Sequence, residues 1–232
     1  MPGKPLDQVN LQKDLQYVLH GTYLHEVFFK ICPPAPGLKV LEPGCGSAKF
    51  AISYALAGAD VTALDLDLGV LAYAKELAAL VNAVTGHPLN LLIQQGSIHK
   101  LTAQYGTEAF DFVLNEGLIH HWSDWRRQSC VNQMVRVTKR GGWVCTVCSN
   151  ALCPEMMAYA ARVDHTYQGM PPRQHPLSPV ELAARLMRAG LDPDTIQVAP
   201  VEPEVAPVAP VAPVVPVAPV AATAPAAPVL PV

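Results

Sequence analysis

The chain has 232 residues, of which 15% are charged, and a formal net charge of −3. This length suffices for one α/β domain with attachments. Proteins that bind nucleic acid usually carry a basic excess, so this balance disfavours RNA or DNA as the main partner. The N-terminal segment MPGKPLDQVNLQKD is polar and contains no apolar run of the secretory type. We therefore expect a cytoplasmic protein.

In a reducing compartment, cysteines are predicted to be free thiols rather than a disulfide framework. Cys145 and Cys148 have the spacing of a redox or zinc pair. Residues three apart on a strand face opposite ways, however, so packing in a central strand is the favoured reading. No metal site is predicted. The six cysteines are Cys32, Cys45, Cys130, Cys145, Cys148 and Cys153.

Residues 1–35 are predicted to form a helical cap, with one or two helices over 6–31. After this cap, apolar strands and periodic helices alternate along the chain. The predicted strands are 38–42, 60–64, 89–95, 110–114 and 143–148; the predicted helices are 47–57, 68–85, 123–140 and 179–190. The third helix is expected to end at Lys139 and Arg140, because cations suit a helix C-terminus. The alternation predicts a doubly wound, mostly parallel, Rossmann-like sheet in a three-layer α/β/α sandwich.

Two regions depart from the alternation. Residues 150–177 are an insertion rich in Met, Tyr, His and Pro, predicted to be irregular and to cover a substrate. Residues 200–232 are an extended tail made mainly of Val, Ala and Pro, with no charge after Glu204 and proline at every third position from 207 to 219. That period matches polyproline II and excludes both a membrane-spanning helix and a sheet-interior strand. Residues 195–198 are one possible further strand, so the C-terminal strands are predicted to be truncated, or completed by another chain.

Residues 41–48, LEPGCGSA, join the first strand to the first helix. Gly44 and Gly46 let the backbone turn sharply and approach a ligand closely; simple turn glycines are the plain alternative. A dinucleotide loop needs a third glycine where this chain has Lys49. Glu42 would repel a pyrophosphate, but it can hold an ammonium group. The loop therefore favours a cationic ligand over NAD.

Asp65 ends the second predicted strand, where a carboxylate can accept bonds from two ribose hydroxyls. An alternative role is to cap the next helix, which Asp67 suits better. In an open parallel sheet, ligands bind beyond the carboxyl ends of the strands. The loop at 44–48, Asp65, and residues 96–98 and 115–122 are thus expected around one crevice, whose ligand has a ribose and an amine.

Five successive segments, VLEPGCGSA, VTALDLD, QQGSI, FDFVLNEGLIHHW and MVRVTKRGGW, resemble in order the motifs of class I S-adenosylmethionine-dependent methyltransferases. The resemblance covers about residues 36–150 and is nearest to the quinone-biosynthesis branch. It implies a methyltransferase domain over 36–199 that uses S-adenosylmethionine. Two positions depart from the family: Ala48 replaces a third loop glycine, and Ser97 replaces a common acid. The implied cofactor contacts are Glu42, Gly44, Cys45, Gly46, Asp65, Leu66, Gly96, Ser97, Ile98, Asn115 and Glu116.

Within that set, the resemblance implies that Glu42 and the loop glycines hold the methionine end and Asp65 the ribose. Ser97 and Ile98 would contact adenine, and Asn115 would lie beside the sulfonium.

The predicted reaction is in-line methyl transfer to a small organic acceptor, with alignment and exclusion of water as the main task. A base is needed only for an acceptor that carries a proton; His121 is the candidate, and a structural role for it and His120 stays open. Two rivals are a non-catalytic S-adenosylmethionine-binding regulator or scaffold whose tail recruits partners, and an NAD or nucleotide-sugar enzyme. The oligomeric state is open. The aromatics Tyr17, Tyr23, Trp122 and Tyr159 could surround a sulfonium or pack in the core.

Overall fold

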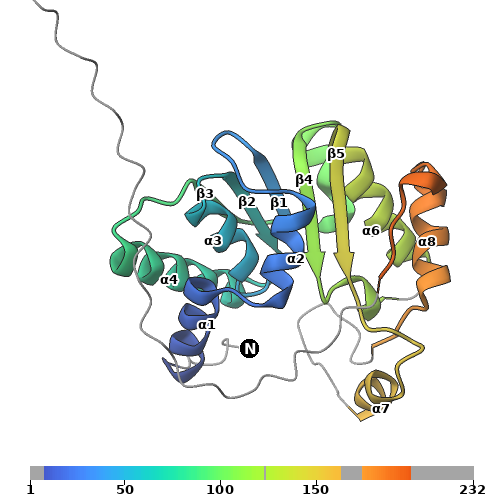
Figure 1. The fold of residues 1–232 in the computed structure, drawn as a ribbon, viewed down its shortest axis with the longest axis horizontal. Coiled ribbons are helices and arrows are strands. Elements are labelled where there is room, and N and C mark those ends of the chain that lie inside the picture. The colour runs from blue at the N-terminus through green and yellow to red at the C-terminus, as the bar shows by residue number, and fades with distance from the viewer. Residues whose placement is uncertain (1–7, 123, 163–173, 200–232) are drawn as a thin grey trace, which may run out of the picture. The chain divides into compact units, whose positions relative to one another are not determined.

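A computed structural model describes residues 8–122, 124–162 and 174–199 (Figure 1). The strands are β1 (Lys39–Pro43), β2 (Asp60–Asp65), β3 (Leu91–Gln95), β4 (Phe110–Glu116) and β5 (Thr138–Val147). The α-helices are α1 (Gln8–His20), α2 (Tyr23–Ile31), α3 (Lys49–Leu56), α4 (Leu68–Thr85), α5 (Leu101–Tyr105), α6 (Asp124–Val137), α7 (Pro154–Arg162) and α8 (Pro179–Arg188). The predicted strand–helix alternation is confirmed, and the two-helix form of the cap is the one adopted.

Within the described residues the sheet has five strands in the order β3-β2-β1-β4-β5, and every neighbouring pair is parallel. The chain moves outward from β1 to β3 and then returns to β4 on the other side of β1. This reversal is the switch point of a doubly wound sheet, the place at which open parallel sheets generally bind their ligands. The predicted fold class is confirmed.

The sheet separates two hydrophobic clusters, because successive side chains of a strand point to opposite faces. Val40 and Phe112 belong to the cluster that includes residues of α1 to α4. Their neighbours Leu41 and Val113 belong to the other cluster, together with residues of α5 and α6 such as Met134. Helices therefore cover both faces, as expected for a three-layer sandwich (Figure 1).

The N-terminal cap is fastened to the first of these clusters. Phe28 of α2 is fully buried, and its ring lies 4.9 Å from that of Phe50 in α3. The buried Tyr54 hydroxyl donates to the carbonyls of Phe28 and Cys32, both at 2.9 Å. These contacts hold α2 against α3, directly behind the loop that follows β1.

The boundary between α6 and β5 differs from the prediction. The helix ends at Val137, and Lys139 and Arg140 lie in β5 instead of a helix terminus. Thr138 pairs with Phe110, and the Lys139 ammonium lies 2.7 Å from the Asp111 carboxylate. A strand pairing and an ion pair with β4 thus replace the helix-dipole interaction, and the strand begins five residues before the predicted position.

The C-terminal part also needs two corrections. The insertion predicted to be irregular contains α7, which lies beyond the carboxyl ends of β4 and β5 (Figure 1). Residues 195–198 form no strand, because a 3₁₀ turn spans Pro193–Thr195 and the following described residues are irregular. The remainder of the insertion at 163–173 and the proline-rich tail lie outside the described residues.

Helix α4 is long and apolar enough to cross a membrane by length and composition, but a core helix passes the same test. It packs against β2, β3 and α1. Its buried residues Leu71, Ala74, Leu77 and Val81 form one face toward the first cluster. The packing gives α4 a structural place in the sandwich.

Candidate active site

The loop after β1 bends across the end of β2. The amides of Gly44 and Cys45 both donate to the carbonyl of Leu64, at 2.6 and 3.0 Å. Gly44 has φ +70°, and a Cβ there would lie 2.3 Å from Cδ2 of Leu118. Gly46 has φ +53° with nothing within 4 Å of an added Cβ. The absence of a side chain at Gly44 therefore allows Leu118 of the loop after β4 to pack against it, whereas the space beside Gly46 is open.

Ala48 occupies the position of the family's third loop glycine, and its φ of 58° is also left-handed. It precedes α3 without a side-chain cap, so the first amides of that helix are left for other partners. One of them has a partner in Glu42, whose Oε2 accepts from Ala51 N–H at 2.8 Å.

The Glu42 side chain is almost fully buried, at 3% exposure. Burial raises the pKa of this carboxyl to about 8, and the negative charges of Glu116 and Asp65 act in the same direction. The Ala51 hydrogen bond and the Lys49 ammonium oppose the rise in pKa. A cation bound beside this carboxyl would lower its pKa and favour its ionised form.

Asp65 connects the glycine loop after β1 with the turn after β2. Its Oδ2 accepts from Gly46 N–H at 3.1 Å and its Oδ1 from Asp67 N–H at 3.0 Å. A carboxylate oxygen has two lone pairs, so each oxygen keeps capacity for a further donor. The role of capping α4 falls to Asp67, whose Oδ1 accepts from the amides of Gly69 and Val70. The preference for Asp67 as the cap is confirmed.

Asn115 stands at the end of β4 with 0% exposure. Its Nδ2 donates to the carbonyl of Pro43 at 2.7 Å, which ties β4 to the start of the glycine loop. Its Oδ1 is buried and has no hydrogen-bond partner among the described residues. An unmatched buried acceptor costs free energy, so a donor or cation placed there would be favourable. Glu116, the next residue, is exposed.

The loop after β3 forms the other side of the site. Gly96 N–H donates to the Asp65 carbonyl, and a Cβ on Gly96 would lie 2.2 Å from Cδ1 of Leu64. Ser97 caps a short turn by accepting from His99 N–H, and Ile98 is buried. Leu66 is 48% exposed. The predicted cofactor residues from all four loops thus occupy the carboxyl edge of one sheet.

His120 and His121 lie in a 3₁₀ turn, Ile119–His121, after β4. Both are buried, and their ring centroids are 4.6 Å apart. His120 Nδ1 accepts from Ser149 N–H at 3.1 Å, so in the neutral ring the proton lies on Nε2. The role of His121 as a base stays a prediction.

Lys49 links the N-terminal cap to the site, a role that the sequence did not indicate. Its ammonium lies 3.5 Å from the Asp14 carboxylate and 4.3 Å from the centroid of the Tyr17 ring. The face of Tyr17 is thus occupied by a cation of the protein itself. Nearby, His25 is buried against Phe50, and burial lowers the pKa of its imidazole to about 4.

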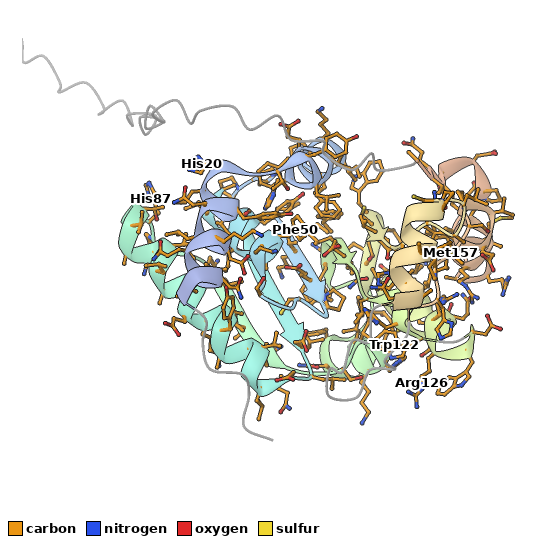
Figure 2. The ribbon with its side chains drawn as sticks, turned by 90° about the horizontal axis from the view of Figure 1, so that it is seen from below. His20, Phe50, His87, Trp122, Arg126 and Met157 are labelled. Atoms are coloured by element: carbon orange, nitrogen blue, oxygen red, sulfur yellow. The ribbon has the colours of Figure 1, made fainter. Side chains whose placement is uncertain are left out.

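The other aromatic candidates are spread out. Tyr23 is 40% exposed, and Trp122 is buried in the second hydrophobic cluster, 5.1 Å from the His99 ring. In Figure 2, Phe50 lies beside the blue cap helices, and Trp122 lies apart from it, close to Arg126. The side chain of Tyr159 lies outside the described part.

Of the two thiols with redox or zinc spacing, Cys145 packs against the first cluster and Cys148 against the second. They lie on or just after β5, the last strand of the described sheet rather than a central one. Burial raises the pKa of Cys145 to about 12 and that of Cys148 to about 11. Among the described residues no group of three His, Cys, Asp or Glu side chains could hold a metal ion.

Comparison with known proteins agrees with this geometry. Residues 41–146 match the family model described as a methyltransferase domain. The chain is similar to a methyltransferase domain over these residues. A ubiquinone biosynthesis O-methyltransferase of Albidiferax ferrireducens is 33% identical over 141 residues, which are 61% of this chain and 48% of the relative. A second, from Vibrio atlanticus, is 34% identical over 141 residues, 61% of this chain and 51% of the relative.

A solved structure supports the fold. Magnesium protoporphyrin IX methyltransferase from Synechocystis PCC 6803, with bound SAH, superposes with a TM-score of 0.55 at 16% identity. The match covers 78% of this chain and 76% of that structure. The chain spans about half the length of the curated relatives first named, so those likenesses concern the domain and not whole proteins.

The residues present fit the cofactor of this class. A cationic ribonucleoside needs acceptors for its hydroxyls and its positive charge, and space beside the loop. The buried Oδ1 of Asn115 and the carboxylate of Asp65 can supply the acceptors, and Gly46 leaves the space. Arg127 of α6 and Leu118 were not found by sequence reasoning, because their contacts join segments far apart in the chain.

Proposed function

We propose that this chain transfers a methyl group from S-adenosylmethionine to an oxygen atom of a small organic acceptor. The observation that carries the proposal is that Asp65 and Asn115 both bond the segment 43–46, Asp65 at the Gly46 amide and Asn115 at the Pro43 carbonyl. The choice of oxygen rests on relatives named as ubiquinone biosynthesis and malonyl-[acyl-carrier protein] O-methyltransferases. A small acceptor is also consistent with the lack of a basic excess.

In this proposal, S-adenosylmethionine supplies an activated methyl group on a positively charged sulfur. Asp65 would accept bonds from the ribose, and Glu42 would face the ammonium of the methionine end. Binding of that ammonium would favour the ionised form of Glu42, whose pKa is otherwise raised by burial. The open side of Gly46 would allow the backbone to approach the ligand.

A phenolic or similar hydroxyl acceptor must lose its proton as it gains the methyl group. We assign this task to His121, which stands in the turn beside the glycine loop. The buried setting of the turn would keep water from the reacting atoms. The rest of the rate enhancement would come from alignment of acceptor and donor.

Calorimetry tests the cofactor. We expect binding of S-adenosylmethionine and S-adenosylhomocysteine and none of NAD; the reverse pattern would refute the proposal. Methyl transfer is then tested with labelled S-adenosylmethionine, first with catechol and caffeate as probe acceptors and afterwards with a cell extract. The position of the label in the product identifies the acceptor atom.

His121→Ala tests the base. We expect turnover to fall by about 10²–10⁴, the usual contribution of general acid–base catalysis, with little change in S-adenosylhomocysteine affinity. Equal turnover in the variant and the parent from pH 6 to 9 would remove His121 from the mechanism.

A further inference from the structure

Two adjacent arginines near the start of α6 have opposite surroundings. Arg126 is exposed and stacks over Trp125, 5.3 Å from the ring centroid (Figure 2). Arg127 is only 5% exposed. Its Nε donates to the carbonyl of Ile119 at 3.2 Å, and its Nη2 donates to the carbonyl of His175 at 2.7 Å. Within the described residues no carboxylate forms an ion pair with Arg127.

A buried guanidinium is costly unless its donors are matched, and an apolar side chain of similar volume often stabilises a core equally well. Arg127 donates hydrogen bonds to backbone carbonyls of two separate segments. One segment is the turn Ile119–His121, which follows β4; the other is residues 174–177, which precede α8. The arrangement fixes the distance between these segments rather than simply filling space.

The two segments are also joined directly. His175 N–H donates to the carbonyl of His120 at 2.6 Å. Ser149, just after β5, donates from its amide to His120 Nδ1 and from its hydroxyl to Gln174 Oε1. Leu177 N–H returns a bond to the Ser149 carbonyl at 2.9 Å. The His120 ring is thus held at Nδ1 from one side, and its backbone from another.

This network stands next to the glycine loop. Leu118, the residue before the turn, packs so closely on Gly44 that a Cβ there would lie 2.3 Å from its Cδ2. A shift of the turn would therefore move the histidine pair relative to the loop that faces the cofactor. Errors of about 1 Å in such a position can cost about a hundredfold in rate.

We propose that Arg127 is a positioning residue for the acceptor side of the methyl-transfer site. By holding the carbonyls of Ile119 and His175 together, its guanidinium fixes the directions of the His120 and His121 imidazoles. The inference rests on the proposed function for its catalytic consequence, but not for its structural one. A guanidinium presents several donors in a rigid fork, whereas a lysine ammonium is a single point on a flexible stem. Lysine at position 127 has three donors, but all on one atom of a flexible stem, so it cannot hold the two carbonyls at the fixed separation that Nε and Nη2 set.

The test compares Arg127→Met and Arg127→Lys with Arg126→Met as the matched control, all in the full chain. Nitrogen-15 spectra of labelled histidine report the ring tautomer, and in the parent His120 should show an unprotonated Nδ1. We expect both Arg127 variants to lose this single-tautomer signature while binding S-adenosylhomocysteine within about twofold of the parent. Turnover on the best probe acceptor should fall about tenfold to a hundredfold. Arg126→Met should match the parent in all three measurements.

Unchanged histidine spectra in folded Arg127→Lys would overturn the proposal. So would a loss of S-adenosylhomocysteine affinity as large as the loss of turnover, because that pattern marks a general structural role. If Arg127→Met fails to fold, Arg127→Lys keeps the charge and decides the matter. The spectra need no acceptor, so a failure of the proposed function would appear as absent turnover in the parent and leave the tautomer result intact.

Discussion

At the scale of single residues, a substitution at Gly46 can be compared with one at Gly86 to distinguish an effect of backbone strain from a block to ligand binding. Its left-handed φ of +53° and the open space around it resemble those of Gly86, which has φ +69° and ends α4. Alanine at either position costs about 1–2 kcal/mol of unfolding free energy through strain. We expect only Gly46→Ala to weaken S-adenosylhomocysteine binding, by about tenfold or more, because its added methyl occupies the ligand's side of the loop. Denaturant unfolding and calorimetry on both variants check this; equal affinities would place the ligand elsewhere.

Glu42 links the same site to pH. In the unfolded chain the pKa of its carboxyl is about 4.3, whereas in the folded protein burial raises the pKa to about 8. Between these values the unfolded state binds fewer protons, so stability is full below pH 4.3 and is lost as pH rises toward 8. The loss for the cofactor-free protein is on the order of a few kcal/mol. We expect Glu42→Gln to be less sensitive to pH and more stable than the parent at pH 8.

The measurement is urea unfolding without cofactor from pH 6.5 to 8. The lower limit avoids His25, whose pKa is lowered to about 4 and whose contribution to stability is lost as pH falls from about 6.5 toward 4. Identical pH slopes in parent and variant would contradict the assignment. The variant should also bind S-adenosylhomocysteine more weakly, because an amide has no charge to offer an ammonium.

The sequence indicated Glu42, Gly44 and Asp65 because each lies at a fixed distance from the end of a recognisable strand. It did not indicate the contact of Leu118 with Gly44 or the two carbonyls held by Arg127. Those contacts join segments that are far apart in the sequence, so no local pattern predicts them.

At the scale of elements, the two acids after β2 divide their work between helix and site. Asp67 caps α4, and its replacement by alanine should cost about 1 kcal/mol of unfolding free energy. Asp65 binds the amides of Gly46 and Asp67, and Asp65→Ala should weaken cofactor binding by about 1.5–3 kcal/mol, the range for hydrogen bonds to a charged group. Each variant is the control for the other in unfolding and calorimetry. Unchanged cofactor affinity in Asp65→Ala would show that another residue holds the ribose.

Element type was predictable where one local signal dominated. Apolar runs between turn residues gave all five strands, since a buried parallel strand needs apolar side chains on both faces. The end of α6 was not predictable, because Lys139 pairs with Asp111, 28 residues away, and Thr138 joins the ladder with Phe110. Helix α7 was missed because the proline-rich surroundings of the insertion concealed a single short helix.

At the scale of the whole molecule, one topological fact organises the site. The strands are parallel, so the loops after β1, β2, β3 and β4 lie at the same edge, and the strand order reverses beside β1. The cap reaches this edge through Lys49, and α6 reaches it through Arg127. The proposed cofactor contacts Glu42, Gly46 and Asp65 lie in and after β1 and β2, whereas His121 follows β4. We therefore expect substitutions in the two groups to alter binding and turnover separately.

The proline-rich segment at 200–232 should be dispensable for folding and for cofactor binding. Residues Met1–Val201 form one compact unit, and the five-stranded sheet lies entirely within it. Prolines at every third position remove backbone donors, so a segment of this composition can join neither a helix nor a sheet interior. Small Val and Ala side chains would bury little surface there. We expect a chain that ends after Glu204 to keep its melting temperature within a few degrees and to bind S-adenosylhomocysteine with unchanged affinity. Scanning calorimetry and titration check both; a fall of many degrees would mean that the segment packs on the domain.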